Sequence, residues 1–207
     1  MKIDVVIDVV CPWCFVGKRE LDKALAARPD IDVEVTYLPY QLAPYTPLEG
    51  VDRASYYKKK FGDGPQLATM RQHLHDKGAA LDIDFDFESE CNIANTLDAH
   101  RLIGWAKSAG CQPEVAEAIM KAYFEKSAFI GDHALLSTIA ECAGMDVDLV
   151  NELLSSDRDV SLIKNEIERV QSMGIQGVPF FIFDGKTAVS GAQPSEALVQ
   201  IMDKLSK

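Results

Sequence analysis

The sequence is poor in cysteine, in positive charge and in long apolar runs, and each scarcity excludes a class of protein. Five cysteines in 207 residues are too few and too unevenly spaced for a disulfide-stabilised scaffold. The 32 acidic residues outnumber the 21 lysines and arginines, and with a formal net charge of −11 we expect no nucleic-acid partner. No run is long and apolar enough to cross a bilayer, so we expect no membrane partner.

The N-terminal segment does not have the pattern of a secretory signal. Asp4 and Asp8 interrupt its apolar run, and no small-residue cleavage site precedes the first cysteine. We therefore expect a cytoplasmic protein, in a compartment where structural disulfides are disfavoured. The composition, 47% hydrophobic and 26% charged, is that of an ordinary globular domain. The one basic run, residues 58–60, is expected to be a solvated helix face.

Two of the five cysteines, Cys11 and Cys14, form a CPWC motif between a strand pattern and a helix pattern. This context is typical of redox-active pairs. Free backbone N–H groups and the helix dipole favour the thiolate form of Cys11 at the helix start, and Cys14 is expected to be more buried. We expect Cys11 to attack a substrate disulfide and Cys14 to resolve the mixed disulfide.

Two other interpretations of the pair fit less well. A structural zinc site needs four ligands, and Cys91, Cys111 and Cys142 stand singly, so we predict no metal. Two inert core cysteines would not explain why the pair lies between a strand and a helix. Each of the three single cysteines falls in or beside a helical pattern and is expected to be a small buried hydrophobe.

Strand patterns lie at the two ends of the chain. Residues 3–10 and 31–37 are predicted to be strands on either side of a helix that begins near Pro12. Residues 180–183 and 187–189 flank an Asp-Gly turn signal and are predicted to form a hairpin.

The middle of the chain has helical periodicity and almost no strand signal. Helices are predicted over 52–61, 66–79, 93–109, 114–124, 134–143, 148–155 and 159–173, with a last helix after Pro194. We therefore predict an α/β protein in which residues 1–41 and 174–207 form one domain and residues 42–173 form a helical insertion.

Several segments together resemble the DsbA-like thioredoxin family over essentially the whole chain, and within it the cytoplasmic FrnE-like branch. These segments are CPWC, YLPYQLAP, NTLDAHRL, GIQGVPFFIF and VSGAQPSEALVQIM. The resemblance implies a thioredoxin fold with a large helical insertion domain. It also implies thiol–disulfide exchange on proteins, in the sense of oxidation, isomerisation or reduction.

The resemblance assigns roles to particular residues. Cys11 would be the exposed nucleophile, Cys14 the resolving thiol and Pro179 a cis-proline. Pro12, Trp13, Val178 and Pro179 would form the substrate site, with the Val178 backbone offering hydrogen bonds to a peptide. The implied partners are protein or peptide thiols and disulfides, with glutathione or a thioredoxin-type system recycling the pair. No metal or flavin cofactor is implied, since the two sulfurs carry the electrons.

The same fold includes kappa-class glutathione transferases and 2-hydroxychromene-2-carboxylate isomerases, in which a serine replaces the first cysteine. Asn95, Ser190, Gly191 and Gln193 resemble parts of their glutathione site, although Asn95 would equally support helix packing and residues 190–193 would equally cap the last helix. A glutathione-dependent isomerase or transferase acting on a small aromatic compound is therefore the alternative function. A third alternative is a chaperone-like binder whose helical part holds apolar segments.

Overall fold

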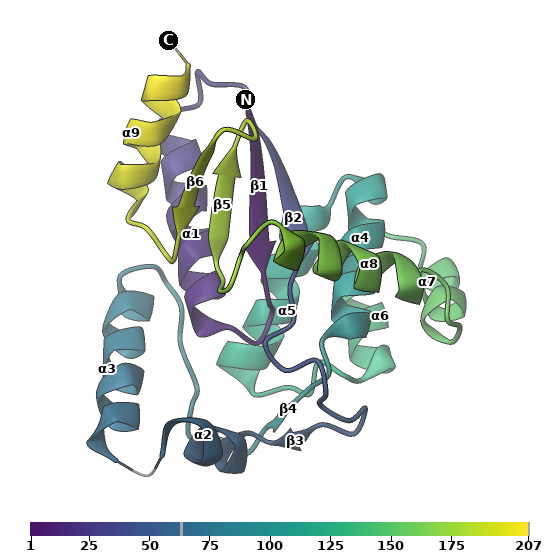
Figure 1. Ribbon diagram of the computed structural model, residues 1–207. Helices are drawn as coiled ribbons and strands as arrows, with labels where there is room; N and C mark the ends of the chain where they lie inside the picture. The colour runs from purple at the N-terminus through teal and green to yellow at the C-terminus, as the bar shows by residue number, and fades with distance from the viewer. Residues whose placement is uncertain (63, 207) are drawn as a thin grey trace.

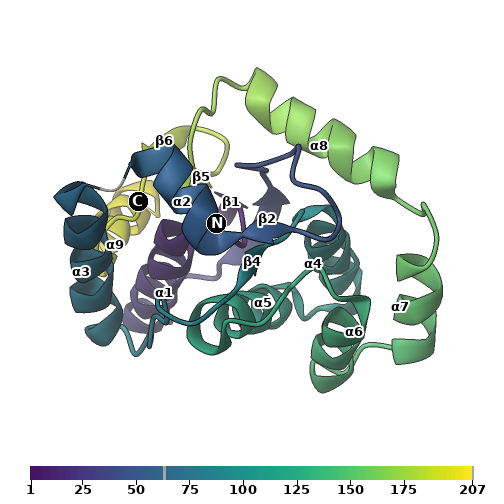
Figure 2. The same ribbon diagram turned by 90° about the horizontal axis from the view of Figure 1, so that it is seen from below.

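The structure is a computed structural model that describes residues 1–62 and 64–206. The predicted segments 42–173 and 174–207 each contain one residue outside the described part, at positions 63 and 207. The described residues form a four-stranded sheet, a two-stranded ladder and helices on both faces of the larger sheet (Figures 1 and 2). The predicted α/β class is confirmed.

The four-stranded sheet joins the two ends of the chain in the order β2–β1–β5–β6. β1 (Lys2–Ile7) runs parallel to β2 (Glu34–Pro39) and antiparallel to β5 (Phe180–Phe183), which pairs with β6 (Thr187–Ser190). Ile3, Val5, Val6 and Ile7 of β1 have no exposed surface. A run of β-branched residues is stable there because helices cover both faces of the central strand.

Helices α1 (Pro12–Ala27) and α9 (Ser195–Leu205) pack against each other beside the sheet. α8 (Val160–Ser172) crosses the opposite face and contacts β2, whereas α4 (Leu97–Ala109) and α5 (Gln112–Lys126) contact β2 from the side of α1 (Figure 2). β2 is therefore covered on both faces although it lies at the edge of the sheet.

The remaining elements extend this body at two places. α2 lies next to the ladder of β3 and β4, and α3 packs on α2 and α1. α6 lies beside α4, and α7 packs on α6 (Figure 1). Their bounds are Val51–Asp52 for β3, Arg53–Phe61 for α2, Pro65–Ala79 for α3, Asn92–Ile93 for β4, His133–Cys142 for α6 and Val147–Leu154 for α7.

Three predicted boundaries are wrong. The first strand ends at Ile7 rather than residue 10, because the Cys11 N–H donates to the Asp8 carbonyl and closes a turn (3.0 Å). The helix predicted over 93–109 begins at Leu97, because residues 92–93 pair as β4 instead. The second strand is Glu34–Pro39 rather than 31–37, and its buried and exposed side chains do not alternate along its whole length.

Packing from both faces explains the second strand. Thr36 lies on the face that the alternation assigns to solvent, yet it is buried. Helices from distant parts of the chain cover that face, so the local pattern does not report it. The hairpin prediction is confirmed: Asp184 and Gly185 both take positive φ (48° and 65°), as a tight hairpin turn requires.

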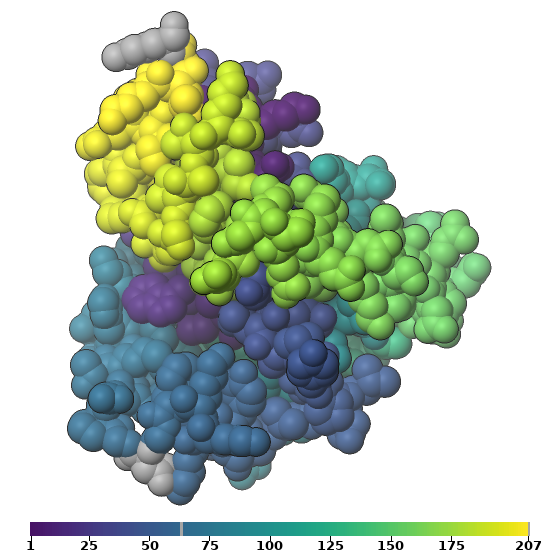
Figure 3. All heavy atoms as spheres, viewed as in Figure 1, coloured from purple at the N-terminus to yellow at the C-terminus, as the bar shows by residue number. Residues whose placement is uncertain are grey.

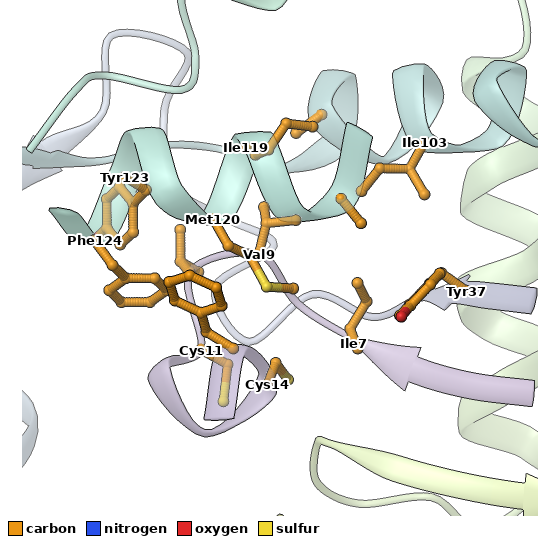
Figure 4. Packing of buried hydrophobic residues seen from close by; sticks show 14 of the residues in the cluster. Ile7, Val9, Cys11, Cys14, Tyr37, Ile103, Ile119, Met120, Tyr123 and Phe124 are labelled. Atoms are coloured by element: carbon orange, nitrogen blue, oxygen red, sulfur yellow. The ribbon is translucent and has the colours of Figure 1, made fainter. Parts of the chain in front are cut away.

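One large hydrophobic cluster extends from the central strand into the helical middle of the chain. Ile7 and Val9, near the two cysteines, belong to the same cluster as Ile119 and Met120 of α5 (Figure 4). The helical part thus shares a core with the sheet, and the division at residues 42–173 remains a prediction.

Candidate active site

The CPWC motif occupies the turn between β1 and the start of α1. Cys11 is the N-cap residue of α1, and the Cys14 N–H donates to the Cys11 carbonyl (3.0 Å). Pro12 takes the first helical position, where a missing N–H leaves no hydrogen bond unmade. Both cysteines are free thiols whose side chains project from the same end of α1 (Figure 4).

Cys11 is less exposed than predicted. Only 6% of its surface is accessible, so the implied exposed nucleophile is in fact buried. The cause is tertiary packing, because side chains of α2, together with Leu42 and Trp13, surround a pocket beside the Cys11 side chain. Access to the Cys11 sulfur is therefore restricted to the directions that these groups leave open.

Cys14 has no exposed surface. Burial, followed by the neighbouring Cys11 thiol, raises the pKa of the Cys14 thiol well above its ordinary value. Cys14 is therefore a protonated thiol at neutral pH, and it must lose its proton before it can act as a nucleophile.

The segment that faces the cysteines comes from the far end of the sequence. The Val178–Pro179 peptide bond is cis, as the resemblance implies. The Cys11 Sγ atom lies 3.6 Å from the Val178 carbonyl oxygen. The Pro179 carbonyl accepts a hydrogen bond from the Gly191 N–H (2.8 Å), whereas no acceptor takes the Val178 N–H within residues 1–62 and 64–206. A role of this N–H in binding substrate remains a prediction.

Gly17 allows this segment to approach α1. A Cβ atom on Gly17 would lie 2.9 Å from Pro179 Cγ and 3.2 Å from Phe181 Cζ, both closer than ordinary van der Waals contact. The glycine therefore sets how near the cis-proline comes to the helix that carries the two cysteines.

A buried acid–base pair lies at the same end of the sheet, and the sequence did not reveal it. The Asp8 carboxylate accepts the Leu42 N–H (2.7 Å), and its other oxygen lies 3.5 Å from Nε2 of His100. His100 Nε2 is 2.9 Å from the Tyr40 carbonyl, and because a carbonyl only accepts, this nitrogen carries a proton. The sequence signals were an acidic residue inside an apolar run and a single histidine in a helical pattern, which is more often a packed or solvated residue.

Asn95 makes contacts that support packing. Its amide nitrogen donates to the Thr46 carbonyl (2.8 Å), and its oxygen accepts from the Gln41 side chain (3.0 Å) and the Leu97 N–H (3.1 Å). These bonds hold the loop after β2 to the start of α4. A role for Asn95 in binding glutathione remains a prediction.

The turn before α9 is likewise held by its own contacts. Gln193 Nε2 donates to the Ser190 carbonyl (2.8 Å), and Gly191 takes positive φ (80°). The carboxylate of Glu20 accepts the Ser195 N–H at the start of α9 (2.9 Å). A carboxylate of the protein thus already accepts one N–H at the start of α9, and a role for Ser190, Gly191 and Gln193 in binding glutathione remains a prediction.

An apolar pocket with a volume of about 130 Å³ adjoins the CPWC motif. It was not predicted, because its described walls come from five separate segments of the chain. They are Val10, Cys11, Pro12 and Trp13 of the motif region, Leu42 and Ala43 after β2, Tyr56, Tyr57, Lys60 and Phe61 of α2, and Met70 and Ile93. In Figure 3, purple atoms of the N-terminal region are visible between the blue α2–α3 region and the yellow-green hairpin.

The other three cysteines do not join the pair. Cys91 is buried as predicted, but Cys111 is half-buried and Cys142 is exposed, so the prediction of buried hydrophobes is wrong for these two. Cys111 lies in the turn before α5 and Cys142 is the last residue of α6, where the helix end faces solvent. In the described part of the chain, no cluster of three or more His, Cys, Asp or Glu residues suits a metal ion.

No helix within the described residues is long and apolar enough to span a membrane. A family model described as DSBA-like thioredoxin domain matches residues 2–203. The structure is similar to the probable DsbA oxidoreductase SCO1869 from Streptomyces coelicolor, at 28% identity, a TM-score of 0.89, and coverage of 99% of this chain and 89% of that chain.

Two more distant structures share the fold. A 2-hydroxychromene-2-carboxylate isomerase is 15% identical with a TM-score of 0.73. The match covers 100% of this chain and 95% of the isomerase chain. The cytosolic disulfide reductase DsbM from Pseudomonas aeruginosa, solved with glutathione, is 13% identical with a TM-score of 0.69 and complete coverage of both chains.

Proposed function

The chain belongs to the family of DSBA-like thioredoxin domains, and we propose that it is a thiol–disulfide oxidoreductase whose redox pair is Cys11 and Cys14. Its thioredoxin fold with added helices agrees with the prediction from sequence. One observation carries the proposal: a free Cys14 lies behind Cys11, whose sulfur faces the Val178 carbonyl beside the cis-proline at 3.6 Å.

The proposed exchange needs only the two sulfurs. The Cys11 thiolate attacks one sulfur of a substrate disulfide, forms a mixed disulfide and releases the other substrate sulfur as a thiolate. Cys14 then loses its proton and attacks Cys11, which forms the Cys11–Cys14 disulfide and releases the second substrate thiolate. The protein loses two electrons and the substrate disulfide gains them. In the reverse direction, the protein disulfide oxidises a substrate dithiol.

We propose that the substrate is held on both sides of Cys11. The Val178 N–H and carbonyl offer a strand-like pairing edge to an extended peptide, and Pro179 fixes the direction of that edge. Pro12 and Trp13 form the wall of the adjoining pocket. The substrates of this proposal are protein or peptide disulfides and thiols.

We further propose that the protein works in the cytoplasm and that glutathione or a thioredoxin-type protein recycles its redox pair. The support is the fold shared with a cytosolic disulfide reductase solved with glutathione. A cytoplasmic thiol pool would keep the pair reduced unless an oxidised substrate is present.

Single cysteine variants test the roles of the two sulfurs. Cys14→Ser is expected to accumulate a stable mixed disulfide between Cys11 and a peptide disulfide, because no resolving thiol remains. Cys11→Ser is expected to trap nothing, because the buried Cys14 is protonated. Mass spectrometry after acid quenching measures both. Trapping through Cys14 in the Cys11→Ser protein would contradict the assignment.

The alternative function is a glutathione-dependent isomerase or transferase for a small aromatic compound. The apolar pocket beside Cys11 and the fold shared with 2-hydroxychromene-2-carboxylate isomerase favour it. It would require Cys11 alone, so full turnover by the Cys14→Ser variant with glutathione and an aromatic substrate would support it. A chaperone-like binder would instead keep its clients when both cysteines are replaced by serine.

A further inference from the structure

The apolar pocket adjoins Cys11, the nucleophile of the proposed exchange. The sulfur-bearing residue is 6% exposed and is itself one of the pocket's walls. On its other side, Cys11 packs toward the Val178 carbonyl and the start of α1. The atoms next to the sulfur of a disulfide that reacts with Cys11 would therefore adjoin the pocket.

The size and lining of the pocket suit one large apolar side chain. Its volume, about 130 Å³, is close to the ~150 Å³ of an apolar protein cavity that admits benzene. Trp13, Tyr56, Tyr57 and Phe61 supply aromatic walls. Leu42 and Phe61 are also partly exposed to solvent, which places an apolar rim at the mouth.

Among the described residues that line the pocket, one is charged: Lys60 of α2. Its ammonium group lies 3.4 Å from the Tyr56 hydroxyl and over the rings of Tyr56 and Phe61, at 5.5 and 5.6 Å from their centroids. Within residues 1–62 and 64–206 it forms no ion pair, in a chain with a net charge of −11. The predicted solvated helix face thus also supplies a cation at the pocket.

We propose, on the basis of the function proposed above, that this pocket selects substrates whose reacting cysteine lies beside a large apolar or aromatic side chain and a carboxylate. The apolar side chain fills the pocket and the carboxylate pairs with the Lys60 ammonium group. The substrate class is then an acidic, aromatic-containing peptide segment, although the net charge of the whole protein repels acidic partners at long range.

The reaction is the exchange already described, so no further reactant is required. The peptide sulfur bonds to the Cys11 sulfur while its former partner leaves as a thiolate. The pocket acts before this step by holding the side chain next to the reacting sulfur, which brings the two sulfurs into reach. Specificity should therefore appear in the second-order rate constant of the first exchange.

A peptide panel tests the proposal. Each peptide carries its cysteine as a mixed disulfide with 2-mercaptoethanol, flanked by Phe and Glu in either order, and the reference peptides carry Ser for Phe or Gln for Glu. Replacing Phe by Ser is expected to lower the rate constant about tenfold or more. Replacing Glu by Gln is expected to lower it about two- to fivefold at low salt, as for a partly exposed ion pair.

Protein variants separate the pocket from the rest of the surface. Lys60→Gln is expected to bring the Glu/Gln rate ratio to about one, whereas Lys59→Gln on the exposed side of the same helix keeps the ratio. Ala43→Phe adds a ring to the pocket wall and is expected to abolish the Phe/Ser ratio, whereas Ala54→Phe, which is exposed and does not line the pocket, keeps it.

The simple disulfide of 2-mercaptoethanol has neither an apolar side chain nor a charge. It therefore separates a failure of the pocket proposal from a failure of the proposed exchange function. If Cys11 reacts with it but the peptide panel gives equal rates, the pocket proposal is overturned and the exchange function stands. Ratios that survive Lys60→Gln and Ala43→Phe also overturn the pocket proposal. If Cys11 reacts with neither kind of disulfide, the proposed function itself fails.

Discussion

Cys11 and Cys14 share one helical turn but differ in what surrounds them. Cys14 is fully buried, and this burial is the largest cause of its raised pKa. The burial persists when Cys11 is bonded to a substrate. Only the thiolate attacks a disulfide. The resolving step therefore depends on a small ionised fraction of Cys14 at neutral pH.

Resolution of the mixed disulfide is expected to accelerate about tenfold per pH unit between pH 7 and pH 9, since the thiolate fraction grows in that proportion below the pKa. Quenched-flow trapping of a preformed mixed disulfide on Cys11 measures this rate. The Cys14→Ser protein serves as the control without resolution. A rate that does not change over this pH range would show that deprotonation of Cys14 does not limit the step.

Gly17→Ala is expected to lower the free energy of unfolding by about 1–2 kcal/mol, because the new methyl group would lie 2.9 Å from Pro179 Cγ. Exchange with peptides is expected to slow as well, since the Val178 edge must shift. Gly104→Ala in α4 is the matched control: its Cβ meets only the tip of Ile163, at 3.3 Å. Urea unfolding measures both, and a stabilised Gly17→Ala protein would contradict the close approach.

The site could be predicted where its residues carry a local signature. Cys11 and Cys14 lie in one short motif, and Val178 precedes a proline at the start of an apolar strand. The burial of Cys11, the Asp8–His100 pair and the pocket arise only when segments far apart in the chain meet. No spacing in the sequence reports those contacts.

Among the elements, α4 carries a buried charge that holds the end of α7. The Arg101 guanidinium donates to the carbonyls of Leu153 (2.6 Å), Ser156 (2.7 Å) and Arg158 (2.9 Å), and pairs with Asp98. Helix C-termini leave carbonyls without partners, and a buried arginine has enough donors to satisfy several of them. Arg101 thus connects α4 to the chain between α7 and α8.

Arg101→Leu is expected to lower the free energy of unfolding by about 3–5 kcal/mol, because it leaves buried carbonyls and Asp98 without their partner. Arg158→Leu removes a guanidinium that is 72% exposed and is expected to change stability by less than about 0.5 kcal/mol. Chemical denaturation of the two variants gives the comparison. Equal effects would contradict a structural role for the buried arginine.

Helices were predictable from sequence because their apolar spacing and caps are local. Asp132 caps α6 through the Ala134 N–H, and Gly110 ends α4 in the left-handed region, as their positions in the sequence indicate. β2 was less predictable, because helices cover the Thr36 face from elsewhere in the chain. The two-residue strands β3 and β4 are too short to produce a pattern.

At the scale of the whole molecule, the shared core contains tyrosines that resist ionisation. Burial is the largest cause of the shift in each case. It raises the pKa of Tyr37 and Tyr123, and it raises the pKa of Tyr57 to about 12. Above pH 10 the unfolded chain releases these protons while the folded chain retains them. The contribution of these neutral tyrosines to the free energy of unfolding is therefore present below pH 10 and is lost as the pH rises toward 12.

The free energy of unfolding is expected to fall by about 1.4 kcal/mol per pH unit for each of the three tyrosines above pH 10. Urea unfolding of the oxidised protein at pH 9, 10 and 11 measures the slope without a contribution from the Cys14 thiol. Tyr57→Phe is expected to make the slope shallower, whereas Tyr45→Phe, at a position 96% exposed, leaves it unchanged. A constant stability up to pH 11 would contradict the burial argument.

The central claim is that Cys11 and Cys14 are the redox pair of the molecule. Equilibration in graded glutathione buffers, followed by thiol trapping and mass spectrometry, tests it most directly. The account predicts one Cys11–Cys14 disulfide, formed at a potential between about −270 and −120 mV, with Cys91, Cys111 and Cys142 trapped as thiols. Accumulation of a Cys11–glutathione adduct with Cys14 left free would contradict it.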